Sequence, residues 1–138
     1  LAAGVAIALA EAGRNVSFAY NRKEAKDHGE GGLLVGAPLR GKVMIVDDVI
    51  SAGTSVRESV ELIRQQGAQP AGVVIALDRM EQGRDARSAV QEVEQDLGLP
   101  VLKIATLADL MLLLQADARY SAELPRLAAY RDQYGVVA

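Results

Sequence analysis

The sequence predicts an α/β fold in which a parallel sheet is flanked by helices. Short apolar runs, such as residues 42–46 (KVMIV) and 71–77 (AGVVIAL), alternate along the chain with stretches of helical periodicity. Polar, glycine-containing turns follow two of these runs, after Val46 and after Leu77. Because ligands of parallel sheets bind at the carboxyl ends of the strands, we expect a site where these two turns meet.

The individual elements are predicted from apolar spacing and from residues that start or stop helices. Continuous apolar runs between turns predict strands that are buried on both faces. Apolar residues three and four apart, followed by glycine, predict helices. In the first half of the chain we expect a buried helix 1–12 packed on a sheet, strand 15–20, a long loop 21–36, strand 42–46, turn 47–54, and helix 55–66 with Val56, Val60 and Ile63 on its apolar face. Strand 71–77 and loop 79–84 follow, and then a helix that Asp85 caps and Gly98 ends. The last elements are strand 101–105, helix 107–115, which begins with a Thr106–Asp109 capping box, and a helical stretch that begins again near Pro125 and ends at Tyr134.

Composition excludes several classes of protein. The 138 residues carry 15 basic and 18 acidic groups, and a net charge of −3 argues against a protein that coats nucleic acid. The absence of cysteine excludes disulfides, zinc–thiolate sites and a cysteine nucleophile. No apolar run approaches the roughly 18 residues of a membrane span. The chain opens with Leu1 in what reads as the middle of a protein, so we expect residues 1–138 to form one domain of a longer chain.

The most informative segment is VMIVDDVISAGTSVRES, residues 43–59. An apolar strand leads into two adjacent acids, Asp47 and Asp48, and a turn of small and hydroxyl-bearing residues then precedes a helix. Backbone N–H groups in such a turn, together with the positive end of the helix dipole, suit a phosphate. The acids suit ribose hydroxyls or a hydrated Mg²⁺ ion instead. The segment therefore predicts a sugar-phosphate site, although it matches neither the GxxxxGK[ST] nor the GxGxxG pattern.

Ordinary structural roles are also open to these residues. Ser55 and Glu58 have the spacing of a capping box, and Asp47 can serve as a turn acid. Because adjacent buried carboxylates repel each other unless a ligand uses them, the acid pair favours the binding interpretation.

A second segment, residues 20–32 (YNRKEAKDHGEGG), concentrates charge and glycine. Four potential cations, Arg22, Lys23, Lys26 and His28, lie within seven residues, and glycines follow them as a hinge. Acidic neighbours offset this charge, which argues against a nucleic-acid patch. The composition suits a lid that closes over a pyrophosphate, and the alternative is a solvated charged loop.

These two segments carry a resemblance to a known family. The strand, the acid pair and the small-residue turn resemble the motif with which type I phosphoribosyltransferases bind phosphoribosyl diphosphate (PRPP). The loop at residues 22–32 is similar to the catalytic loop of the orotate phosphoribosyltransferase family, and Arg79 stands where that family presents an arginine to the orotate carboxylate. A guanidinium matches a carboxylate in two hydrogen bonds, although Arg79 can also pair with Asp78 or Glu81. The resemblance extends over essentially the whole chain.

The resemblance implies a type I phosphoribosyltransferase (Rossmann-like) core that converts PRPP and orotate to orotidine 5′-monophosphate and pyrophosphate in de novo pyrimidine synthesis. It implies a cytoplasmic homodimer in which the loop at residues 22–28 reaches the neighbouring subunit, with Mg²⁺ held mainly through PRPP and not by direct protein ligands. Lys26, Asp47 and Asp48 are the implied catalytic residues. The implied PRPP-binding residues are Arg22, Lys23, Lys26, His28, Asp47, Asp48, Val49, Ile50, Ser51, Ala52, Gly53, Thr54 and Ser55. The implied orotate-binding residues are Ser51 and Arg79.

The sequence departs from the family in two respects, and two alternatives remain. Ser51 replaces the threonine common in the family but keeps its hydroxyl, and residues 1–138 do not include the family's N-terminal portion with its aromatic orotate cradle.

One alternative function is that of a regulatory protein that binds PRPP without turnover, which the negative net charge and the 22–28 loop disfavour. The other is a phosphoribosyltransferase for another base, which the loop and Arg79 disfavour.

Overall fold

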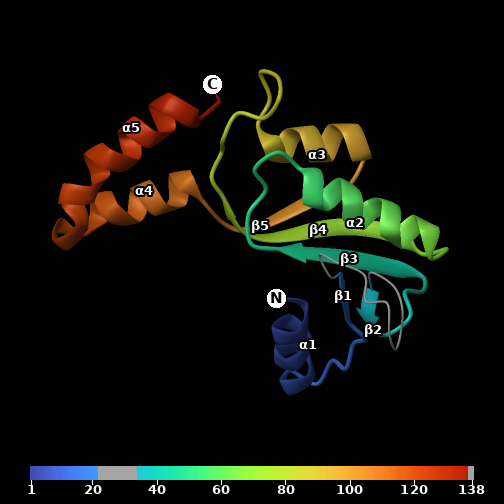
Figure 1. The fold of residues 1–138 in the computed structure, drawn as a ribbon. Coiled ribbons are helices and arrows are strands. Elements are labelled where there is room, and N and C mark those ends of the chain that lie inside the picture. Colours follow the sequence, from blue (N-terminus) through green and yellow to red (C-terminus); the bar gives the residue numbers. More distant parts are fainter. Residues whose placement is uncertain (22–33, 137–138) are drawn as a thin grey trace.

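The computed structural model describes residues 1–21 and 34–136 and contains two sheets (Figure 1). The elements are α1 (Ala2–Glu11), β1 (Ala19–Asn21), β2 (Leu34–Gly36), β3 (Lys42–Asp47), α2 (Thr54–Gln65), β4 (Gln69–Asp78), α3 (Ala89–Leu97), β5 (Val101–Thr106), α4 (Leu107–Ala116), the 3₁₀ helix η1 (Ala118–Glu123) and α5 (Leu124–Tyr134). The parallel sheet has the order β3-β4-β5, and β1 pairs with β2 in a small antiparallel ribbon. The predicted α/β fold with a parallel sheet flanked by helices is therefore confirmed.

The core lies between the parallel sheet and the two helices that cover one of its faces, α2 and α3 (Figure 1). The apolar face predicted for α2 is buried as expected. Alternate residues of the strands meet it, because side chains of a strand point to opposite faces of the sheet. The central buried side chains are Ile45, Val56, Val60, Ile63, Val73, Ile75, Val90, Val93 and Val101.

The opposite face of the sheet is largely open in the described part of the chain. Met44, Leu102 and Ile104 are 45%, 58% and 78% exposed, so the prediction that the strands are buried on both faces is wrong here. Helix α1 lies beside β1 and β2 (Figure 1) and buries only Ala6, so the prediction of a buried helix packed on the sheet is also wrong. Its alanines and leucines make α1 helical, but burial depends on which other elements are there to cover it.

Three further boundaries differ from the predictions. The strand expected at 15–20 is β1, only three residues long, and Leu34–Gly36, expected to be loop, pairs with it as β2. Helix α3 begins after Ser88, not Asp85, because Ser88 and Gln91 form a capping box. Asp85 instead accepts hydrogen bonds from the guanidinium and from the backbone N–H of Arg87, and these hydrogen bonds lower the pKa of Asp85 to about 2.

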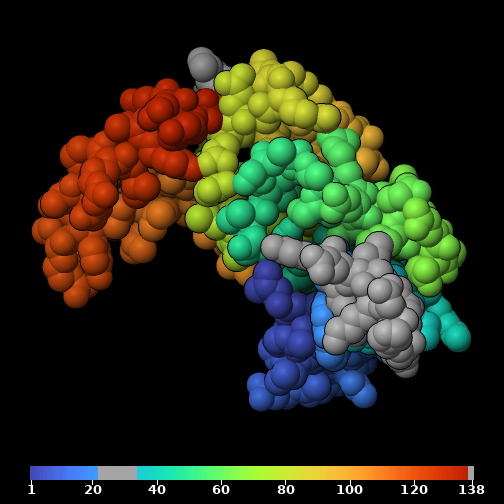
Figure 2. Space-filling model, viewed as in Figure 1, coloured from blue at the N-terminus to red at the C-terminus, as the bar shows by residue number. Residues whose placement is uncertain are grey.

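The end of the chain follows the predicted pattern. The Thr106–Asp109 capping box opens α4, and Pro125 lies in the first turn of α5, where its missing N–H costs nothing. Helices α4 and α5 lie side by side and project from the body formed by the sheet, α2 and α3 (Figures 1 and 2). Within residues 1–21 and 34–136, no helix combines the length and the apolarity that crossing a bilayer requires.

Candidate functional site

The turn between β3 and α2 has the geometry of an anion cradle. Gly53 is the residue that precedes α2, and its φ of 68° is a left-handed conformation that glycine adopts with little strain. A Cβ atom at this position would lie 2.9 Å from Cγ2 of Val93. The described residues supply no side-chain cap to α2, so its first N–H groups remain available to a ligand.

The acid pair at the end of β3 is held by short-range hydrogen bonds. Asp47 accepts from the backbone N–H of Asp48 at 3.0 Å and from the Ser55 hydroxyl at 3.1 Å. Asp48 accepts from the N–H of Val49 at 2.8 Å. The capping box considered for Ser55 and Glu58 is therefore absent, because the Ser55 hydroxyl is directed to Asp47. Both acids border the turn, as the sugar-phosphate interpretation requires.

The same turn is tied to the next strand. The carbonyl of Asp48 accepts hydrogen bonds from the N–H groups of Ala76 and Leu77, at 3.0 and 3.1 Å, near the end of β4. Just beyond that end, Arg79 Nη2 donates to the Ser51 hydroxyl at 2.6 Å. The structure thus brings together Ser51 and Arg79, the two residues implied as an orotate-binding pair.

Arg79 also forms an ion pair with Glu81, one of the two acids that the sequence left open as its partner. Its Nη2 atom lies 2.9 Å from a carboxylate oxygen of Glu81. Asp78, the other acid considered, instead lies 3.9 Å from Lys103 and accepts from the N–H of Met80. The Arg79 side chain stays 32% exposed, and its Nε atom has no hydrogen-bond partner within the described residues. Pairing with Glu81 therefore orients the guanidinium without enclosing it.

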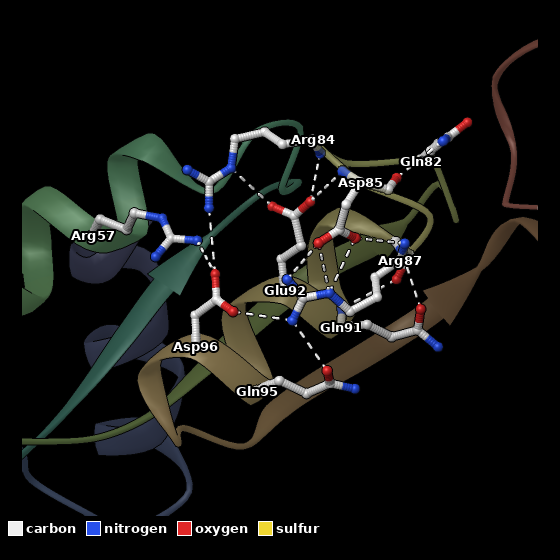
Figure 3. Close-up of polar contacts among 10 residues, drawn as sticks. Arg57, Gln82, Arg84, Asp85, Arg87, Gln91, Glu92, Gln95 and Asp96 are labelled. Carbon is white, nitrogen blue, oxygen red and sulfur yellow. Dashed lines mark hydrogen bonds and ion pairs between the residues drawn. The ribbon is translucent and has the colours of Figure 1, made fainter.

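A network of charged side chains, which the sequence did not reveal, braces the loop between β4 and α3 (Figure 3). Glu92 is 1% exposed and accepts hydrogen bonds from the backbone and the guanidinium of Arg84 and from the N–H of Asp85. Asp96 accepts from Arg57 at 2.9 Å, from Arg84 at 3.3 Å and from Arg87 at 3.0 Å. These residues are scattered among other charges in the sequence, so no local signal marks them as partners.

The network connects the start of α2, at the cradle, with the loop that follows Arg79. Arg57 lies in the first turn of α2, where its N–H donates to the carbonyl of Gly53. Its contact with Asp96 therefore holds the cradle end of α2 against α3. Burial raises the pKa of Glu92, but hydrogen bonds from Arg84 and Asp85 outweigh burial and leave the pKa below its usual value. Glu92 is thus an anion at neutral pH and a fixed anchor for the loop that follows Arg79.

The cationic residues predicted for the lid, Arg22, Lys23, Lys26 and His28, lie outside the described residues. The structure does place the two ends of that segment. Asn21 and Leu34 are partners in the antiparallel ribbon, so the chain leaves and returns at neighbouring positions.

Comparison with known proteins shows what this chain resembles. The sequence profile of the family described as "Phosphoribosyl transferase domain" matches residues 1–100. Orotate phosphoribosyltransferases of Chromobacterium violaceum and Neisseria meningitidis are 70% and 66% identical over 136 residues, which is 99% of this chain. The chain spans 64% of the length of both relatives.

Solved structures agree with these sequence matches. An orotate phosphoribosyltransferase of Francisella tularensis has a TM-score of 0.74 at 30% identity, and the match covers 96% of this chain and 61% of that one. An orotate phosphoribosyltransferase of Mycobacterium tuberculosis in complex with PRPP has a TM-score of 0.56 at 28% identity, covering 70% of this chain and 51% of that one.

Proposed function

The chain belongs to the phosphoribosyl transferase domain family, and from that premise we propose that it transfers the phosphoribosyl group of PRPP to orotate. The products are orotidine 5′-monophosphate and pyrophosphate, in de novo pyrimidine synthesis. The observation that carries the proposal is the contact between Arg79 and Ser51, which sets a cation suited to a carboxylate against the turn suited to a phosphate. The identity of 70% to an orotate phosphoribosyltransferase supports the same substrate.

The cradle is proposed to bind PRPP through its 5′-phosphate and its ribose. Residues 49–55 surround the 5′-phosphate with backbone N–H groups and hydroxyls at the start of α2. Asp47 and Asp48 hold the ribose hydroxyls, since carboxylates accept hydrogen bonds from hydroxyls and repel phosphate. Ser51 and Arg79 bind orotate where the turn meets the end of β4.

Catalysis in this proposal needs no covalent nucleophile. Pyrophosphate leaves as C1 of the ribose develops positive charge, so the protein must stabilise the leaving group, orient the base and exclude water. The pyrophosphate is proposed to bind to the cationic side chains of Arg22, Lys23, Lys26 and His28. In a homodimer this loop acts in the neighbouring subunit, with Lys26 as its catalytic residue.

The carboxylates of Asp47 and Asp48 at the cradle fit an Mg²⁺ ion that is carried by PRPP. Each oxygen of Asp47 accepts one hydrogen bond and keeps a lone pair that can face a cation. Mg²⁺ usually keeps several waters and binds through substrate phosphates and one or two carboxylates. When bound with PRPP, it supplies charge neutralisation of the pyrophosphate, and Asp47 and Asp48 are the residues that would face it.

Substituting Gly53 tests the cradle. Gly53→Ala is expected to cost about 1–2 kcal/mol of stability through its positive φ. It is also expected to raise the KM for PRPP by about tenfold, because the added Cβ meets Val93 and displaces the turn. Gly67→Ala is the matched control, since Gly67 has a φ of 74° at the other end of α2 but open space around its Cβ position. Equal KM values for PRPP in the two variants would contradict the cradle.

The reaction itself is tested by ultraviolet spectroscopy. The full-length protein is mixed with orotate, PRPP and Mg²⁺, and the loss of orotate absorbance is followed. Loss that stops when PRPP is withheld supports the proposal. No loss, with PRPP still bound, would favour a regulatory protein of the same fold, and turnover of a different base would reassign the substrate.

A further inference from the structure

The end of the chain packs onto the loop that carries Arg79. After projecting away from the sheet with α4, helix α5 returns so that its last turn lies against the segment after β4 (Figures 1 and 2). The N–H of Gln82 donates to the carbonyl of Tyr134 at 2.7 Å, and the N–H of Val136 donates to the carbonyl of Met80 at 3.2 Å. Glu81 and Gly135 form an antiparallel bridge between the two segments.

This backbone pairing places a side chain of α5 behind Arg79. The Tyr130 hydroxyl donates a hydrogen bond to one carboxylate oxygen of Glu81. The other oxygen of Glu81 lies 2.9 Å from Arg79 Nη2, which in turn donates to the Ser51 hydroxyl at 2.6 Å. A continuous chain of polar contacts thus runs from α5 through Glu81 and Arg79 to the turn after β3.

The chemistry of each link suits a fixed arrangement. The hydrogen bond to Glu81, and then burial, raise the pKa of Tyr130, so its hydroxyl stays protonated as a donor. Because Tyr130 occupies one Glu81 oxygen, the carboxylate is held in one orientation toward Arg79. Arg79 Nη2 donates to Ser51 and forms the ion pair with Glu81, whereas Nη1 makes no hydrogen bond to any described residue. Nη1 is therefore left for a ligand.

We propose that Tyr130 and Glu81 are positioning residues that hold Arg79 in place for the orotate carboxylate, so that helix α5 helps to set the affinity for orotate. The proposal rests on the proposed function, in which Arg79 binds that carboxylate. An arginine side chain loses rotamer freedom when it binds a ligand, and a side chain that is already held loses less. Releasing Glu81 from Tyr130 should therefore weaken orotate binding much more than PRPP binding, because the cradle backbone is also held by the hydrogen bonds between Asp48 and β4.

The test is Tyr130→Phe in the full-length protein. Loss of one hydrogen bond to a charged group is expected to raise the KM for orotate by about threefold to tenfold. The KM for PRPP and kcat should stay within about twofold. Tyr134→Phe is the matched control, because Tyr134 lies on the same helix with its ring centroid 5.0 Å from that of Tyr130, while its hydroxyl makes no hydrogen bond within the described chain. It should leave every constant unchanged.

A double-mutant cycle tests whether Tyr130 acts through Glu81. Glu81→Gln should also raise the KM for orotate, and Tyr130→Phe should add little in that background because its partner is already altered. An additive double variant would overturn the proposal. So would a Tyr130→Phe variant that lowers the melting temperature and raises both KM values together, since that pattern indicates a merely structural role.

The proposal and the function on which it rests fail in different ways. Wild-type protein that consumes no orotate would overturn both. Wild-type turnover with a loss of orotate affinity in an Arg79 variant, but with Tyr130→Phe indistinguishable from wild type, would overturn the positioning role alone.

Discussion

Replacing Lys26 by alanine in the full-length protein is expected to lower kcat by about 100-fold to 1,000-fold. The expectation follows from the chemistry of the leaving group. In the proposed reaction, pyrophosphate departs with several negative charges, and the resemblance assigns Lys26 to stabilise them as the bond to C1 breaks. An interaction made mainly in the transition state lowers kcat and kcat/KM together when it is removed. Initial rates of orotate consumption at saturating PRPP measure this effect.

Lys42→Ala provides the control for the lysine substitution. Lys42 is an exposed lysine at the amino end of β3, whereas the predicted site lies at the carboxyl end of that strand. It should therefore keep wild-type turnover. Melting temperatures of both variants separate loss of chemistry from loss of folding. Wild-type kcat in the Lys26 variant would remove this residue from the catalytic set.

Replacing Arg79 by glutamine is expected to raise the KM for orotate by about 30-fold to 100-fold, since hydrogen bonds to a charged group are lost on binding. Glutamine retains a donor for the Ser51 hydroxyl but has no positive charge for a carboxylate. The KM for PRPP should change much less, because the cradle backbone is fixed separately by the contacts of Asp48 with β4. Steady-state kinetics with each substrate varied in turn measures the difference.

Two comparisons make the Arg79 result specific. Arg79→Lys keeps the charge but loses the planar pair of donors, so its KM for orotate should lie between those of the wild type and the glutamine variant. Arg126→Gln makes the same chemical change at an arginine that is 80% exposed on α5 and should have no effect. Equal losses of affinity for PRPP and orotate in Arg79→Gln would show that Arg79 maintains the structure of the loop and does not bind orotate.

The sequence by itself determined the features that depend on neighbouring residues. Strand β3, helix α2 with its buried Val56, Val60 and Ile63, and the capping box at Thr106 follow from periodicity and local hydrogen bonding, and the structure confirms them. The family resemblance is likewise confirmed, because its motifs are contiguous stretches of chain. The roles of Lys26 and the other lid residues, and the assignment of residues 1–138 to a single domain, stay predictions.

Tertiary structure alone decided which of two plausible partners each polar group takes. The hydroxyl of Ser55 could cap a helix but turns to Asp47, and Arg79 meets both Glu81 and a serine 28 residues away. The sequence also left open which face of the sheet is covered. An apolar strand can be buried, but its sequence does not show which helices or strands cover it. The same limit hid the burial of Glu92 among arginines and the link from Tyr130 to Glu81. Such contacts join residues far apart in sequence, and their free energy depends on a geometry that exists only once the sheet and its helices have assembled.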